Sequence, residues 1–416
     1  MLHKLSLSAL VVVLIAALAA PGVLLAQDDA GFPVPPGRLI IGDENGLYSL
    51  LADGSEKTYL VEEDEANCWL RDGLLSPDGG QMLYTRICGG TSPTDWHAEG
   101  RTASIFLLEL ASGQSTEVVA NDGSYQDYAG AWHPDGTSFV IYSNRSNDRY
   151  NLFLVEGGET AQITDFDTDV GRVSWHPDGR YLIYNRYQVA DNSWDIRAWD
   201  LESRTEKSVV PGLTPHFSPD GEWIVYATTG AAGADVFIMP AACIFSEAEC
   251  DAATTATNIT YTPDIAEREP LWSPDQSQIV YLRDTNPEAT TTTWDVYRQE
   301  IRTGLQQNLT VSSDIKERTT DWERVAGAER VAVESVLPVV MRLTSSTANL
   351  REQPNTTSNV LGVLTGGQLL FVQGANAARD WYLITLPEDG ATAWLFANLA
   401  AEVQGDPASV PEISAE

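Results

Sequence analysis

Histidine, cysteine and basic residues are scarce in this 416-residue sequence. It contains 5 histidines and 4 cysteines, and its 25 Lys and Arg residues are outnumbered by 59 Asp and Glu residues, which gives a formal net charge of −34. A surface of this sign repels phosphate backbones and anionic lipids, so the composition argues against binding to nucleic acid or to a membrane surface. We interpret the charge as solubility outside the cell, with attraction of cations or basic partners as the alternative.

The sequence also lacks the signature of a hydrolase with a separate α/β domain. It has no Gly-x-Ser-x-Gly motif, and no stretch shows the helical periodicity that such a domain requires. A peptidase is therefore not favoured.

Long apolar runs are absent after residue 26, so no later membrane span is expected. Before that point, Lys4 precedes an apolar run over residues 5–20, which is typical of a secretory signal peptide. Leu24 is a poor match to the small residue expected near a cleavage site, so an uncleaved N-terminal anchor is the alternative for residues 1–26. Residues 27–37, with three prolines, are expected to form a linker.

The four cysteines form two pairs that are close in sequence, Cys68 with Cys88 and Cys243 with Cys250. Export permits disulfides, and pairing of sequence neighbours is the simplest of the three possible connectivities. Zinc is the rival interpretation, but no two cysteines have the spacing of a zinc knuckle and no histidine stands beside them.

A five-residue turn recurs along the chain, and each copy has an aromatic residue or leucine, a Ser or His, and then Pro-Asp-Gly. The copies are Leu75–Gly79, Trp132–Gly136, Trp175–Gly179, Phe217–Gly221, the altered Trp272–Gln276, and a remnant at Asp321-Trp322-Glu323. Proline presets φ, aspartate hydrogen-bonds the backbone and glycine adopts the left-handed conformation. A strand with a tyrosine in a fixed column follows the first five copies, at Tyr84, Tyr142, Tyr184, Tyr226 and Tyr281.

The spacing of the turns predicts a β-propeller, since about 43 residues accommodate one four-stranded blade. Six aromatic positions imply six blades. The strands expected at residues 38–60 lack a preceding turn, while residues 319–334 begin a blade without finishing it. We therefore expect the N-terminal strands to complete the last blade, which leaves no open sheet edge.

The turns resemble the Trp-Ser-Pro-Asp-Gly repeats of TolB-like β-propellers over residues 38–335. The resemblance implies a six-bladed propeller in an all-β chain. It is less specific for function, because the same repeat occurs in protein-binding platforms and in propeller-containing peptidases.

The periodicity changes after Ser335, and residues 336–403 resemble a bacterial SH3 (SH3b) domain, a small SH3-like β-barrel. The residues that match the pattern of this family are Asn349, Leu350, Arg351, Pro354, Gly362, Gly367, Trp381 and Trp394. The resemblance implies binding of cell-wall peptides, with Trp381, Tyr382 and Trp394 as ligand candidates, although both tryptophans also suit a core. Residues 404–416 are polar and are expected to form a disordered tail.

One column of the turn varies in a way that could carry function. Its residues are Ser76, His133, His176, Ser218, Ser273 and Glu323, and His216 lies nearby. Equivalent positions of neighbouring blades face one another near the axis, so these residues are candidates for a metal or anion site at the propeller mouth. The alternative is that this column hydrogen-bonds the Pro-Asp-Gly turn, which both Ser and His can do.

These observations predict an exported bacterial protein of the cell envelope without catalytic activity. Its propeller would bind a protein or glycan partner, and its SH3b domain would bind peptidoglycan. No cofactor is expected. The alternating carboxylates of residues 165–169 could suit calcium, but they lack the glycine and distal glutamate of an EF-hand loop. The alternative function is an enzyme, a polysaccharide lyase or hydrolase with a metal site at the propeller mouth.

Overall fold

The recurring turn joins the first two strands of each blade. In the computed structural model of this protein, Gly136 and Gly179 have φ angles of 73° and 75°, in the left-handed region where glycine is not strained. The amide of each glycine donates to the carbonyl oxygen of the histidine three residues earlier, over 3.0 Å in both copies. This hydrogen bond closes the turn and reverses the chain.

The altered fifth copy keeps the same backbone without glycine. Gln276 has φ 64°, and its side chain contacts the turn of the preceding blade. Its Nε2 donates to Oδ2 of Asp220 over 2.8 Å, and its Oε1 accepts from the backbone amide of Asp220 over 2.9 Å. The side chain thus ties two neighbouring blades together at a position where the other copies have none.

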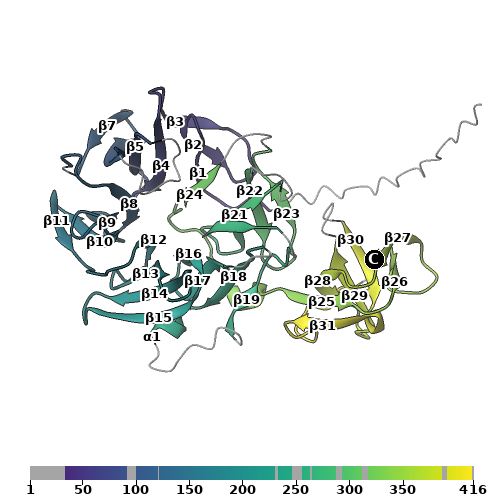
Figure 1. Ribbon diagram of the computed structural model, residues 1–416. Helices are drawn as coiled ribbons and strands as arrows, with labels where there is room; N and C mark the ends of the chain where they lie inside the picture. Colours follow the sequence, from purple (N-terminus) through teal and green to yellow (C-terminus); the bar gives the residue numbers. More distant parts are fainter. Residues whose placement is uncertain are drawn as a thin grey trace, which may run out of the picture. The chain divides into compact units, whose positions relative to one another are not determined.

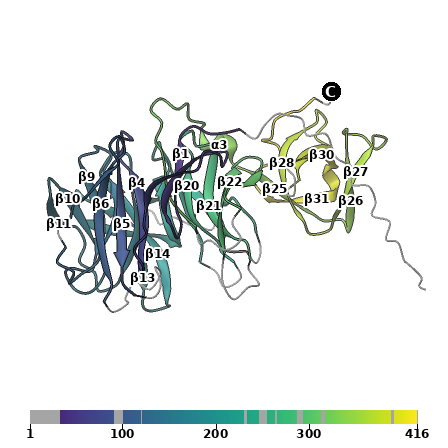
Figure 2. The same cartoon turned by 90° about the horizontal axis from the view of Figure 1, so that it is seen from above.

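The structure describes residues 33–90, 100–119, 121–229, 233–245, 255–262, 265–286, 293–311, 317–386 and 391–414. Within these residues, six four-stranded sheets surround a common axis (Figure 1). Turned by 90°, the strands of several blades lie roughly along the same line as one another (Figure 2). The predicted six-bladed β-propeller is therefore confirmed.

Five blades use four consecutive strands each, listed here from the axis outwards. The first has β4 (Cys68–Leu75), β5 (Gln81–Cys88), β6 (Thr102–Glu109) and β7 (Gln114–Glu117). The second has β8 (Asp127–Trp132), β9 (Ser138–Ser143), β10 (Asn151–Glu156) and β11 (Glu159–Gln162). The third has β12 (Val170–Trp175), β13 (Tyr181–Gln188), β14 (Ser193–Asp200) and β15 (Thr205–Pro211). The fourth has β16 (Leu213–Phe217), β17 (Trp223–Ala227), β18 (Val236–Pro240) and β19 (Thr257–Asn258), with helix α1 (Ala242–Phe245) before β19. The fifth has β20 (Glu267–Trp272), β21 (Gln278–Asp284), β22 (Trp294–Glu300) and β23 (Gln306–Asn308).

The sixth blade joins the two ends of the propeller sequence, as predicted. It consists of β24 (Arg318–Trp322), β1 (Arg38–Gly42), β2 (Gly46–Leu51) and β3 (Thr58–Glu62), in that order. Arg38 and Glu323 hold the closure, because the amide of Arg38 donates to the Glu323 carboxylate and the amide of Glu323 donates to the carbonyl oxygen of Arg38, both over 2.9 Å. The closure pairs residues that are 285 positions apart in sequence.

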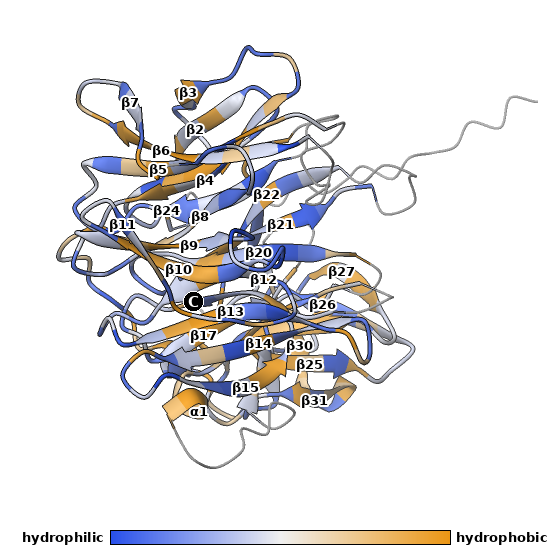
Figure 3. Cartoon of the chain, turned by 60° about the vertical axis from the view of Figure 1, so that its left-hand side comes forward, coloured by the Kyte–Doolittle hydropathy of each residue, from blue (hydrophilic) through white to orange (hydrophobic). Residues whose placement is uncertain are grey.

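The core lies between blades, where apolar side chains of neighbouring sheets meet. Apolar stretches run along strands such as β4, β10 and β17 (Figure 3). The tyrosine column is buried, as expected, with Tyr142, Tyr184 and Tyr281 each at most 1% exposed. Two tryptophans also reach back to the blade before their own: the indole N–H of Trp132 donates to the carbonyl oxygen of Leu74 over 2.9 Å, and Trp272 does the same to His216 over 3.3 Å.

After helix α3 (Val333–Val336), the C-terminal region forms a seven-stranded antiparallel sheet (Figure 1). Its strands, in sheet order, are β27 (Val360–Thr365), β26 (Thr347–Arg351), β30 (Thr392–Phe396), β29 (Trp381–Thr385), β28 (Leu369–Ala375), β25 (Val339–Leu343) and β31 (Ala400–Gln404). A 3-10 helix, η1 (Ala397–Leu399), precedes β31. Its core includes Leu350, Leu370 and Ile384, each at most 3% exposed.

Residues 404–416 were expected to form a disordered tail. The described part of this segment, residues 404–414, packs onto the sheet. Val410 is 5% exposed and belongs to the same core. The amide of Ala375 donates to the carbonyl oxygen of Pro411, and the amide of Ile413 donates to that of Ala375. A buried Val410 and two backbone hydrogen bonds therefore attach the segment to the sheet. Among the described residues, no helix is long and apolar enough to cross a membrane.

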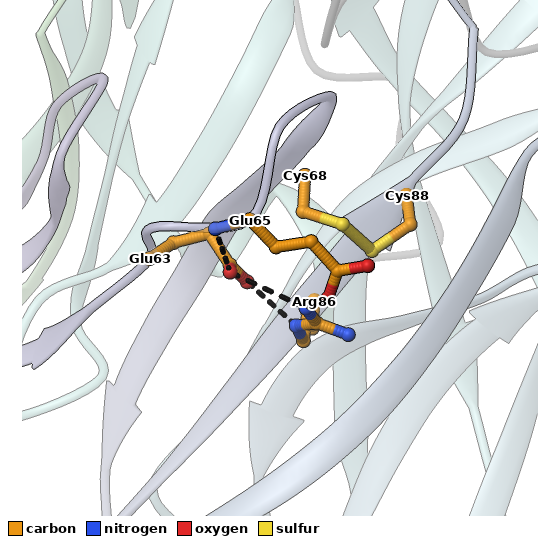
Figure 4. The surroundings of a disulfide bond; sticks show 5 residues. All are labelled: Glu63, Glu65, Cys68, Arg86 and Cys88. Atoms are coloured by element: carbon orange, nitrogen blue, oxygen red, sulfur yellow. Dashed lines mark hydrogen bonds and ion pairs between the residues drawn. A yellow bond between two sulfur atoms is a disulfide. The ribbon is translucent and has the colours of Figure 1, made fainter.

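Cys68 and Cys88 form a disulfide between opposite residues of β4 and β5 (Figure 4). Cys243 is also disulfide-bonded, while Cys250 lies outside the described residues. Beside the first disulfide, Glu63 and Glu65 both pair with Arg86. These carboxylates lie near Cys68 in a grouping that could hold a cation. However, the sulfur of Cys68 is already bonded in the disulfide, and both carboxylates already form ion pairs with the guanidinium of Arg86.

Replacement of both cysteines, Cys68→Ser with Cys88→Ser, is expected to lower the free energy of unfolding. The bond closes a loop with a sequence separation of 20 residues, for which chain entropy corresponds to about 3 kcal/mol. Denaturant unfolding under oxidising conditions measures the difference. Under reducing conditions the variant and the parent should have about the same stability, and a difference that persists there would assign the effect to packing.

Candidate functional site

The innermost strands of all six blades surround an axial channel, in which two cavities share part of their lining. The smaller, about 60 Å³, is lined by residues near the ends of these strands, including Trp132, Trp175 and His216. The larger, about 580 Å³, is lined by residues near their starts. Arg172, Thr214 and Glu269 line both cavities. A volume of this size is ordinary for a small-ligand pocket.

A β-bulge on the inner strands aims charged side chains into this channel. The register shifts between Arg71 and Leu74 on β4 and between Arg268 and Leu271 on β20. Both shifts lie just before the residue that opens the turn, Leu75 or Trp272. Asp72 and Glu269 stand at the bulges with φ of 53°, a region that non-glycine residues rarely occupy. Thr214 of β16 has φ 50° in the same column. Such strain is often found at functional positions.

Four arginines line the larger cavity together with the carboxylates Asp169 and Glu269. The arginines are Arg71 on β4, Arg172 on β12, Arg268 on β20 and Arg318 on β24. Nη1 of Arg318 lies 2.9 Å from Oε1 of Glu269, and Nη2 of Arg172 lies 3.3 Å from that same oxygen. Arg172 also lies 3.9 Å from Oδ1 of Asp72. Two guanidinium groups therefore share one carboxylate oxygen.

Three buried polar atoms of this cluster have no hydrogen-bond partner among the described residues. They are Nη2 of Arg172, Oε2 of Glu269 and Oγ1 of Thr214. Nη2 of Arg172 is attracted to the carboxylates of Glu269 and Asp72 in ion pairs, but neither carboxylate accepts a hydrogen bond from it. Buried polar atoms left this way are costly in a folded chain, and a bound group is one way to satisfy them.

The pKa values in the channel show an excess of positive charge. The charge of Arg71, reinforced by burial and by Arg172, lowers the pKa of Arg318 to about 10. Burial would raise the pKa of Glu269, but the four arginines together hold it below its ordinary value. Further along the channel, burial and the charges of Arg324 and Arg172 lower the pKa of His216 to about 4, so its imidazole is neutral at pH 7.

The rest of the larger cavity is mixed in character. Tyr150, Trp194 and Leu213 provide aromatic and apolar surface, and Asn185 provides an amide. Asp169 also lines the cavity, and it forms an ion pair with Arg149 and accepts a hydrogen bond from the amide of Tyr150. The cavity therefore combines a cationic end with an apolar wall.

The serines of the varying column lie in their own turns. Oγ of Ser76, Ser218 and Ser273 each donates to the carboxylate of the turn aspartate two residues later, over 2.6 Å. All three serines are at most 3% exposed. The carboxylate of Glu323 accepts a hydrogen bond from the amide of Arg38, where the sixth blade closes the ring.

The histidines of that column bond to the turn of the next blade. Nε2 of His133 donates to the carbonyl oxygen of Gly179 over 3.3 Å, and Nε2 of His176 donates to that of Gly221 over 3.2 Å. His216 instead lines the channel, where its Nδ1 donates to the carbonyl oxygen of Phe217 over 2.9 Å. The structure thus places the three rings at separate hydrogen-bonded positions, and a metal site at the mouth stays a prediction.

Two of the three carboxylates considered for calcium have arginine partners. Asp169 pairs with Arg149, and Asp167 lies 3.9 Å from Nη2 of Arg186. Calcium and zinc both stay untested predictions.

In the C-terminal sheet, the two tryptophans proposed as ligand contacts belong to the interior. Trp381 and Trp394 are each 5% exposed, and Trp381 packs edge-on against Phe396. Tyr382 is half-buried against the core. Exposed apolar side chains are found instead on the edge strand β27, where Val360 and Val363 are 49% and 59% exposed.

The channel arginines were missed from the sequence, although a signal was present. Arg71, Arg268 and Arg318 each stand four residues before the last aromatic or leucine of their inner strand. A charged residue in one column of three repeats indicates a shared environment. The sequence does not reveal that this environment is a channel, because the side chains are directed toward the axis by the β-bulge.

Comparison with known proteins supports both modules. Residues 346–400 match the family described as bacterial SH3 domain. The chain is 24% identical over 212 residues to a Bacillus subtilis protein named uncharacterized peptidase YuxL. The aligned residues make up 41% of this chain and 31% of that protein. The chain thus spans less than a third of this curated relative.

Solved structures with the same kind of fold are more distant. TolB from Agrobacterium tumefaciens is 16% identical, with a TM-score of 0.47 over 66% of this chain and 89% of that one. An oligogalacturonate lyase from Vibrio parahaemolyticus is 12% identical, with a TM-score of 0.41 over 89% of this chain and 99% of that one. The chain is a six-bladed propeller by its own sheet topology, with TolB structural neighbours, and a region that matches the bacterial SH3 domain family follows the propeller.

Proposed function

We propose that this chain is an exported, non-enzymatic binding protein of the bacterial cell envelope. Its SH3b domain would hold it at peptidoglycan, and its propeller would bind a protein or glycan partner. The match of residues 346–400 to the bacterial SH3 family carries the proposal. The disulfide between Cys68 and Cys88 supports export, because such bonds persist in oxidising compartments.

The propeller supports binding more directly than catalysis. Its channel offers a cavity of about 580 Å³ with fixed charges, which suits recognition of a ligand. The ring nitrogens of His133 and His176 are engaged with backbone groups of turns. Two binding modules on one chain would also raise avidity through effective concentration.

Retention on purified peptidoglycan tests the envelope half of the proposal. We expect the full chain to sediment with insoluble peptidoglycan and a chain that lacks residues 336–416 to stay in the supernatant. Circular dichroism should show that the truncated chain keeps its β-structure. Equal sedimentation of the two proteins would contradict the proposal.

A further inference from the structure

We propose that the arginine-lined end of the axial channel is a carboxylate-binding site that accepts the C-terminal carboxylate of an extended peptide. This site deepens the proposed function, because it names the chemistry by which the propeller holds its partner. The following steps use the geometry of Arg71, Arg172, Arg268, Arg318 and their surroundings.

The charge balance favours an anion. Four guanidinium groups and two carboxylates, Asp72 and Glu269, meet at the cavity. The charge of Asp72 is shared further, because its Oδ2 accepts from Thr85 Oγ1 over 3.2 Å and from the hydroxyl of Tyr142 over 3.4 Å. Asp169 has its own partner in Arg149. The lining of this cavity thus includes four arginines beside the two carboxylates Asp169 and Glu269, in a chain whose net charge is −34.

The donors available in the cavity suit a carboxylate. Arg172 and Thr214 line both cavities. Oγ1 of Thr214 is buried without a hydrogen-bond partner among the described residues, and Nη2 of Arg172 has only its ion pairs with Glu269 and Asp72 there. A guanidinium and a hydroxyl that line the same cavity can each donate a hydrogen bond to a carboxylate, and charge-assisted hydrogen bonds are the stronger kind. Glu269 competes for the same arginines, so it sets how strongly the site attracts an anion.

The surroundings of the site favour a ligand with one terminal charge over a polyanion. The strongly acidic chain repels molecules with many negative charges. Trp194, Tyr150 and Leu213 line the same cavity and provide apolar surface for side chains that precede the terminus. A peptide whose last residues enter the channel satisfies both conditions, whereas an acidic glycan presents a charge on each sugar.

Equilibrium dialysis of the full chain against two peptide pools tests the site. Both pools contain N-acetylated tetrapeptides randomised over uncharged residues, and they differ only in ending with a carboxylate or a carboxamide. Mass spectrometry of the retained peptides should show the carboxylate pool enriched at least about tenfold over the amide pool, as expected for a charge-assisted pair. Equal retention of the two pools would overturn the proposal.

Two variants distinguish binding from a structural role. Glu269→Gln removes the competing carboxylate, so the carboxylate pool should bind about 3- to 10-fold more tightly. If Glu269 only stabilised the fold, its replacement by glutamine would not increase the affinity for the carboxylate pool. Arg172→Gln should instead abolish the enrichment, and Arg172→Lys should retain part of it because the charge remains.

Matched controls come from an ion pair on the outside of blade three. Arg180 and Glu202 are exposed partners there, so Arg180→Gln and Glu202→Gln make the same changes of charge and should leave retention unaltered. Preferential retention of a trimer of D-galacturonate over the carboxylate pool would overturn the peptide assignment. Sedimentation with peptidoglycan should not change in these channel variants, so failure of this inference is separable from failure of the envelope proposal.

Discussion

A chain that lacks residues 33–62 is expected not to fold into a propeller. This segment provides β1, β2 and β3, three of the four strands of the sixth blade. Leu39, Ile41, Leu47, Tyr48 and Leu50 are each at most 2% exposed. At about 1.5–3 kcal/mol for each buried side chain, their loss approaches the whole stability of an ordinary domain, about 5–15 kcal/mol.

The loss also opens the ring. Without β1, the strand β24 keeps no partner in its own sheet, and its unpaired backbone becomes a site for aggregation. Calorimetry should show no cooperative transition for the propeller, and the protein should sediment as aggregates. A chain that starts at Pro33 is the matched control and should melt like the parent. A cooperative transition of undiminished enthalpy in the shorter chain would show that the closure is dispensable.

Truncation of one turn tryptophan, Trp272→Ala, is expected to lower the free energy of unfolding by about 3–5 kcal/mol. Trp272 is 3% exposed and packs with Val225 and Ile238 of the fourth blade and with Ile279 and Tyr281 of its own. Its removal therefore leaves a cavity between two sheets, where the propeller gains much of its burial. Its indole hydrogen bond to the carbonyl oxygen of His216 is lost as well.

Trp272→Phe serves as the comparison, because the phenyl ring keeps much of the packing and loses the hydrogen bond. The bond itself corresponds to about 0.5–1.5 kcal/mol, so most of the effect of the alanine variant should be absent. Urea unfolding monitored by circular dichroism measures both variants. A loss below about 1 kcal/mol for Trp272→Ala would mean that the blades reposition to fill the space.

Much of the fold could be predicted because the repeat encodes it locally. A Pro-Asp-Gly turn followed by a strand with a buried tyrosine needs only neighbouring residues to form, and five copies at regular spacing reveal the array. The closure was predictable for a related reason, since a blade without a beginning and a blade without an end complement each other. The match of residues 346–400 to the bacterial SH3 family likewise follows from residues close in sequence.

The candidate site was predicted less well, because its residues come together only when strands that are far apart in the chain pack around one channel. His133 and His176 share a column with serines and Glu323, which made that column look functional. Their rings reach the next blade's turn, and only the angle between blades determines that contact. The tail after β31 differs from expectation for a similar reason, because burial of Val410 depends on the sheet beneath it.

The sequence by itself therefore determined the blade, the number of blades and the order of the modules, since turns and alternating strands are set by neighbouring residues. The tertiary structure decided what lines the axis. Arg71, Arg172 and Arg318 lie about 100 to 250 positions apart along the chain, and no local pattern brings them together. The closed ring does so, because each blade contributes its inner strand to one channel, and a bulge on that strand directs the charged side chain inward.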